Sequence, residues 1–282
     1  MSEHAEHQDL HMASFNVNPI VQVARNEFYI LMEQPLTLII ALVILVIAVI
    51  HGAGNSIILP QASGLFTPGG VLITMGMTNS YFYTTMFTSF LALCVGIMSI
   101  SGERSNGSIQ VLLTKPLYRR DVAAGKFIGG SLFMTVTVIA TLIVCVASML
   151  ITYRDTLPYL ELLVRTCLYG LILSIYCSIT LGIAMLIGSF FKERSAALIA
   201  SFCYLYFALI QTAYFEDLGS LSKIDPYLLY TFAFSPVGKT VFDMSGSIMS
   251  WIGSSTPYIA LLLLEVVIVF LFNCLVFNNE EA

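Results

Sequence analysis

The hydrophobic positions of this chain gather into long uninterrupted runs that short polar stretches separate. A helix needs about 20 apolar residues to cross the ~30 Å hydrocarbon core of a membrane, and six runs are long enough. None of them alternates apolar and polar residues as the strands of a membrane barrel do. The predicted spans are 35–57, 81–101, 127–151, 162–190, 195–215 and 256–277.

A shorter periodic pattern at 19–34 precedes the first span. Asn18 is suited to cap a helix there, Pro19 to begin it and Pro35 to end it. Because this helix is too polar to span, we expect it to lie in the membrane interface. At helical spacing, its apolar face holds Ile20, Val23, Ala24, Phe28 and Leu31, and its polar face holds Gln22, Asn26, Tyr29 and Glu33.

Composition agrees with this pattern. The 282 residues are 57% hydrophobic and only 10% charged, whereas soluble domains average about 25% charged residues. We therefore predict an all-α integral membrane protein that lies in the cell membrane and has no nucleic-acid partner. Its parts are a disordered tail (1–18), the interfacial helix (19–34), a six-span membrane domain (35–277) and a second tail (278–282).

The placement of basic residues predicts the orientation of the chain. If the N-terminus is cytoplasmic, eight lysines and arginines lie inside and four lie outside, as the positive-inside rule requires. Both termini are then cytoplasmic. The external segment 216–255 is too long for a bare connection, and its apolar part, which contains Pro236 and Gly238, is expected to form a re-entrant helical segment.

Charge is concentrated in one cytoplasmic stretch, 103–126, which holds seven charged residues. Within it, Ile109, Leu112 and Leu113 recur at helical spacing before Pro116 stops the helix. Apolar side chains that face the cytoplasm are poorly solvated unless a partner protein offers a groove for them. The alternative is an ordinary positively charged loop.

The order of residues in this stretch resembles the first cytoplasmic loop of ABC-2-type transporter permeases. The sequence "ARNEF" (24–28), followed by Pro35, is similar to the interfacial helix of that family, whereas Gln110 stands where many members have Glu. The resemblance implies a coupling helix at 108–116 that docks on a separate ATPase subunit. The docking residues would be Glu103, Arg104, Gly107, Ile109, Leu112, Leu113, Pro116, Arg119 and Lys126.

The chain itself is not expected to hydrolyse ATP or to hold a cofactor or metal. The sequence "VGKT" (237–240) lacks the glycine that a phosphate-binding loop needs at position 233, where Ala233 stands. ATP and Mg²⁺ would bind to the partner ATPase.

Several polar residues inside the spans are candidates for a transport pathway or for coupling. Glu265 lies near the middle of the sixth span, where a charged side chain is costly and usually faces a cavity or a partner such as Arg165 or His51. In the family that the chain resembles, the second and fifth spans border the cavity. Their candidates are Tyr81, Thr84, Thr88, Tyr204 and Gln211, although small hydroxyls also pack membrane helices together.

The sequence therefore predicts the permease subunit of an ATP-driven exporter that pairs with a second copy or a homologous permease. One alternative is a permease that passes ATP-driven motion to an external partner protein without transporting a substrate. The resemblance includes the permeases of nitrous-oxide-reductase maturation systems, which are tied to copper-site assembly. An intramembrane enzyme is less favoured, because the spans lack paired carboxylates, a Ser–His pair or clustered metal ligands.

Overall fold

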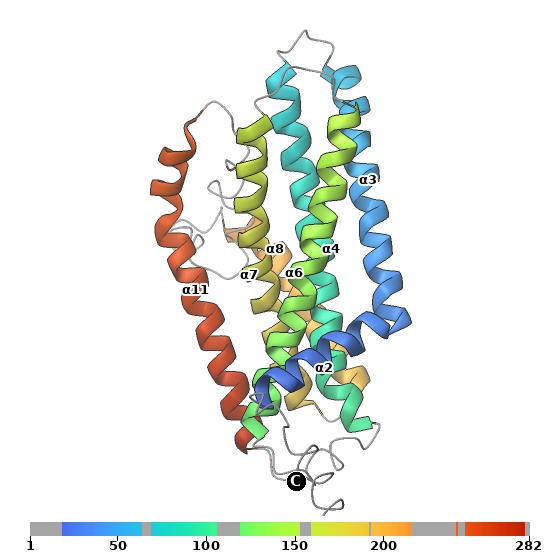
Figure 1. The fold of residues 1–282 in the computed structure, drawn as a ribbon, viewed down its shortest axis with the longest axis vertical. Helices are drawn as coiled ribbons and strands as arrows, with labels where there is room; N and C mark the ends of the chain where they lie inside the picture. The colour runs from blue at the N-terminus through green and yellow to red at the C-terminus, as the bar shows by residue number, and fades with distance from the viewer. Residues whose placement is uncertain are drawn as a thin grey trace, which may run out of the picture.

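The computed structural model describes residues 19–63, 69–105, 119–152, 159–191, 193–215, 241 and 246–279. This part of the chain forms seven α-helices and contains no strand, so the all-α prediction is confirmed for it. Figure 1 shows the long helices side by side in a bundle, with the short α2 lying across one end. The helices are α2 (Pro19–Glu33), α3 (Pro35–Ser63), α4 (Gly69–Ser105), α6 (Arg119–Thr152), α7 (Tyr159–Phe190), α8 (Arg194–Phe215) and α11 (Ile248–Asn279).

Five of the described helices contain an apolar stretch long enough to cross a membrane, as expected of a multi-pass membrane protein. These five match five of the six predicted spans. The remaining predicted span, 195–215, is the fifth along the chain and corresponds to α8. Its apolar stretch among the described residues is the shorter Ser195–Tyr206. The five stretches are Pro35–Ala53, Tyr83–Ile100, Arg120–Ile151, Leu160–Phe190 and Ile248–Phe277.

The helix predicted at 19–34 is observed as α2. Pro19 and Pro35 each occupy the first position of a helix, where the missing N–H leaves no intrahelical bond unmade. Gln34 forms the corner between α2 and α3: its carbonyl accepts a hydrogen bond from the Leu38 N–H at 3.2 Å, and its side chain accepts one from Thr37 at 3.2 Å.

Three helices extend well beyond their predicted spans. α6 begins at Arg119, not at 127. α4 has 37 residues, about 55 Å at the rise of an α-helix, because its helical backbone begins 12 residues before the predicted run, at Gly69, and continues past it to Ser105.

α11 begins at Ile248, not at 256, and includes Pro257. Membrane helices tolerate an interior proline when neighbouring groups satisfy the freed backbone. Ser247 caps α11, with its hydroxyl 3.3 Å from the Ser250 N–H.

Four predicted segments fall wholly or partly outside the described residues. They are the tail at 1–18, residues 280–282 of the second tail (278–282), the coupling helix at 108–116, and residues 216–240 and 242–245 of the external segment.

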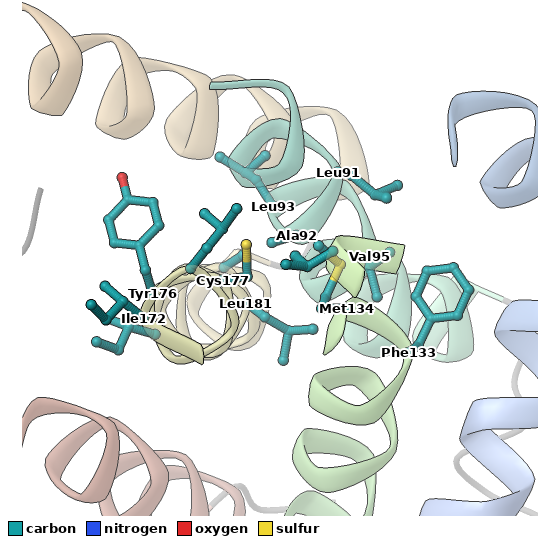
Figure 2. Close-up of a cluster of buried hydrophobic side chains, with 14 of the residues drawn as sticks. Leu91, Ala92, Leu93, Val95, Phe133, Met134, Ile172, Tyr176, Cys177 and Leu181 are labelled. Atoms are coloured by element: carbon teal, nitrogen blue, oxygen red, sulfur yellow. The ribbon is translucent and has the colours of Figure 1, made fainter. Parts of the chain in front are cut away.

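The core of the bundle lies where α4, α6 and α7 meet. α4 and α7 are largely buried, whereas α3 and α11 expose most of their apolar surface. A Cβ atom added at Gly96 of α4 would lie 2.5 Å from the carbonyl oxygen of Leu181 on α7, so these two helices touch backbone to backbone, as small residues allow in membranes. Figure 2 shows part of this core, with Leu91, Ala92, Leu93, Val95, Phe133, Met134, Ile172, Tyr176, Cys177 and Leu181.

The direction of the helices brings several ends together. In Figure 1, α4 ends and α6 begins at the lower end of the bundle, where α2 and the C-terminal end of α11 also lie. We call this the α2 end of the bundle. Residues 106–118 therefore connect two helices at the α2 end.

Candidate functional site

The described part of the predicted docking stretch belongs to the α2 end of the bundle. Glu103 and Arg104 lie in the last turn of α4, and Arg119 is the first residue of α6. The predicted docking residues between them, Gly107, Ile109, Leu112, Leu113 and Pro116, are outside the described residues.

Lys126 does not present its charge to solvent. Its side chain is 3% exposed, and its ammonium nitrogen lies 3.0 Å from Oε2 of Glu27 on α2, whose side chain is 7% exposed. The same nitrogen donates a hydrogen bond to the Ser99 carbonyl of α4 at 3.0 Å. Lys126, predicted as a docking residue, is therefore committed to an ion pair inside the protein.

Ser99 completes this group. Its hydroxyl donates a 2.6 Å hydrogen bond to Oε1 of Glu27, so both oxygens of the carboxylate are occupied. We call the three residues the Glu27–Ser99–Lys126 cluster. It joins α2, α4 and α6, and an almost fully buried pair of opposite charges is stable only when its remaining hydrogen bonds are made, as they are here.

The pattern of α2 explains how Glu27 reaches this position. The buried residues of α2 are Ala24, Glu27 and Leu31, which follow each other at spacings of three and four and so share one face. Glu27 thus stands on the apolar face of an amphipathic helix. A charged residue at such a position indicates a buried partner, and this feature of the sequence would have revealed the cluster.

Two glycines of α6 let α2 approach closely. A Cβ atom at Gly125 would lie 2.6 Å from Cβ of Val23, and one at Gly129 would lie 2.5 Å from the Ala24 carbonyl oxygen. The spacing of four residues places both glycines on one side of α6, as in other close crossings of membrane helices. α2 therefore rests directly on the α6 backbone.

A second buried cation lies at the opposite end of the bundle. Arg165 near the start of α7 is 1% exposed and bonds to Glu161 one turn earlier through Nε at 3.0 Å and Nη2 at 2.6 Å. It also donates to the carbonyl oxygens of Val241 and Gly246, each at 2.7 Å. Sequence reasoning missed this arrangement because backbone carbonyls carry no sequence signature.

The polar candidates of the second and fifth spans are distributed over α4 and α8. Thr84 and Thr88 are buried; the Thr88 hydroxyl donates to the Thr84 carbonyl at 2.6 Å and also bonds to Cys177 of α7. These contacts are those of hydroxyls that pack helices together. Tyr204 is partly buried against the core, and the side chains of Tyr81 and Gln211 are outside the described set.

Glu265 lies in the middle of α11 and is half-buried. Its Oε2 atom is buried and has no hydrogen-bond partner among the described residues. Arg165 is engaged as above, and His51 stacks on Tyr83 with ring centroids 3.8 Å apart. The described residues therefore supply neither of the partners considered for Glu265, Arg165 or His51.

Replacing Glu265 with leucine is therefore expected to leave the thermal stability of the purified chain unchanged or to raise it. The change removes a carboxylate that costs ~2.5–3.5 kcal/mol to place at mid-membrane depth and deprives no described group of a partner. Thermal unfolding in detergent, with Glu265→Gln as the isosteric control, measures this. A loss of ~1–3 kcal/mol would instead indicate a hydrogen-bonded partner left unsatisfied.

Comparison with known protein families gives one assignment. Residues 21–282, nearly the whole chain, match the family described as ABC-2 family transporter protein. No curated protein matches the chain.

Proposed function

The chain belongs to the ABC-2 transporter family and is a multi-pass membrane component of it; from this we propose that it is a permease subunit driven by a separate ATPase subunit. The ATPase docks on the stretch 103–126, and it alone binds ATP and Mg²⁺. This chain transmits the resulting motion to its membrane helices, and the proposed direction of transport is export.

One observation carries the proposal: α4 and α6, which flank residues 106–118, end together at the α2 end of the bundle and are tied to each other there by the Glu27–Ser99–Lys126 cluster. When two helices are held together, a force that the ATPase exerts on the segment between them acts on both helices. This suits a docking element better than an ordinary loop.

The docking surface in this proposal consists of eight residues, because Lys126 is engaged with Glu27. Lys126 is therefore not part of the proposed docking surface. The eight residues are Glu103, Arg104, Gly107, Ile109, Leu112, Leu113, Pro116 and Arg119.

The proposed layout in the cell membrane has six spans, with α8 as the fifth, and has both termini and the α2 end of the bundle in the cytoplasm. The excess of basic residues in the connections assigned to that side supports this orientation. Six helices are few to enclose a pathway, so two permease chains pair around it. Glu265, Tyr81, Thr84, Thr88, Tyr204 and Gln211 are the proposed pathway or coupling residues.

A second candidate function uses the same parts. The permease would transmit ATP-driven motion through its bundle to an external protein, for example in the maturation of a copper site, without passing a substrate. The Arg165 contacts support it, since they connect α7 to the backbone that leads into α11 at the end opposite the docking stretch. Co-purification of an external protein in stoichiometric amount would favour this alternative.

The proposal predicts the composition of the purified complex. A tagged chain isolated in mild detergent from its native host should bring with it an ATPase subunit. Native mass measurement should then give two permease chains and two ATPase chains. The chain isolated without any ATPase would refute docking, and a fully active complex of one permease and one ATPase would refute the pairing of permeases.

A further inference from the structure

Docking of the ATPase involves residues 103–119, which belong to α4, α6 and the segment between them. The Glu27–Ser99–Lys126 cluster also binds α2 to these two helices, which docking alone does not require. We propose that the cluster makes α2 and the adjoining ends of α4 and α6 move as one rigid body, so that α2 transmits the motion imposed on residues 106–118. This inference rests on the proposed function and assigns a positioning role to Glu27, Ser99 and Lys126.

The closed pattern of contacts is the first argument. Lys126 bonds to Glu27 and to the Ser99 carbonyl, and the Ser99 hydroxyl bonds to Glu27. Each helix therefore contacts both of the others through charged or hydroxyl groups. Moving any one helix away breaks two of the three contacts.

Burial is the second argument. The charged side chains of Glu27 and Lys126 are 7% and 3% exposed, so water does not replace the contacts when they separate. Separation leaves two uncompensated charges in a region of low dielectric, which is strongly unfavourable. The contacts therefore persist while other parts of the bundle move.

The third argument is steric. At Gly125 and Gly129 the α6 backbone is in direct contact with Val23 and Ala24 of α2. Packed interfaces of this kind respond to force by moving together, because they have discrete arrangements and little room to deform continuously. This close packing leaves no free space in which α2 could slide along α6.

Charge distinguishes this cluster from simple packing. An apolar pair of similar volume often stabilises a protein as well as a buried ion pair does, but it lacks directional bonds and lets helices rotate or slide. The cluster fixes the orientation of α2 as well as its distance from α6. A double variant, Glu27→Met with Lys126→Met, separates the two properties because it keeps volume and leaves no unpaired charge.

Two measurements on the complete permease–ATPase complex test the inference. First, in a cysteine-free background, spin labels at Val21 of α2 and Leu132 of α6, both exposed, report the distance between these helices. Second, an environment-sensitive fluorophore at Met249, an exposed residue in the first turn of α11, reports whether ATP binding at the docked subunit reaches the opposite end of the bundle, where α11 begins (Figure 1).

In the wild-type chain we expect ATP to leave the Val21–Leu132 distance unchanged and to alter the Met249 signal. The double variant should keep ATPase co-purification and hydrolysis within twofold of wild type while its ATP-dependent Met249 signal falls at least tenfold. Glu33→Met, the same glutamate-to-methionine change at an exposed position of α2, is the matched control and should behave as wild type.

The inference is overturned by a wild-type Val21–Leu132 distance that changes with ATP, and this measurement does not depend on any variant folding. It is also overturned if the Met249 signal of the wild-type chain does not change with ATP, or if the double variant retains the ATP-dependent change. A double variant that folds but loses the ATPase would show that the cluster serves docking, not transmission. A wild-type chain that never binds an ATPase would instead refute the proposed function, which the co-purification step reveals first.

Discussion

Changing both Leu112 and Leu113 to aspartate is expected to abolish co-purification of the ATPase while membrane insertion continues. In the proposed coupling helix these two leucines share one face with Ile109 and Pro116. An apolar face seated in a partner's groove gains its affinity from buried apolar area, and two buried carboxylates without partners remove that gain and add a large desolvation cost. The amount of ATPase retained on the tagged permease measures the effect.

The matched control places the same two charges on the other side of the predicted helix. Gln110→Asp with Thr114→Asp adds two carboxylates at positions about 130° from the apolar face and removes no apolar side chain. Co-purification should survive this change. If the leucine double variant keeps its ATPase, or if both double variants lose it equally, the apolar face is not the docking surface.

This pair of variants and the cluster variants separate two properties of the same end of the bundle. Leu112 and Leu113 are proposed to bind the ATPase, whereas Glu27 and Lys126 are proposed to transmit motion once the ATPase is bound. Loss of attachment in one set and loss of transmission in the other would place the two functions on different residues.

The sequence predicts the helices of this protein well where their apolar runs are long. The span predicted at 162–190 lies within α7, and the α2 prediction differs from the observed helix by one residue at its end. The ends of α4, α6 and α11 were wrong, because hydropathy detects the part of a helix that lies in lipid and not the turns that continue beyond it.

The site was less predictable than the fold, for a physical reason. The positive-inside rule counts basic residues by their place in the sequence, so it assigned Lys126 to the cytoplasmic surface. Whether a lysine is solvated or buried depends on what another helix brings to it, and Glu27 lies 99 residues away. The apolar face of α2 contained the missing information, because Glu27 interrupts it.

Arg165→Met is expected to cause a large loss of stability. Arg165 is buried and serves three acceptors: the Glu161 carboxylate and the carbonyl oxygens of Val241 and Gly246. Methionine fills much of the volume and supplies no donor, so both carbonyls lose a charged partner. We expect a loss of about 3–5 kcal/mol, which should lower the unfolding temperature in detergent by roughly 10 °C.

The geometry of arginine predicts how the control variants rank in stability. The guanidinium of Arg165 reaches its acceptors in different directions through Nε, Nη1 and Nη2, whereas a lysine ammonium offers its donors from a single point. Arg165→Lys should therefore recover only part of the lost stability. Glu161→Gln should cost less than Arg165→Met, because the amide oxygen can still accept a hydrogen bond from Arg165 and the side chain at position 161 is 37% exposed. An Arg165→Met chain that unfolds at the wild-type temperature would show that the backbone at 241 and 246 does not depend on Arg165, and that α7 and the start of α11 are held together by apolar packing alone.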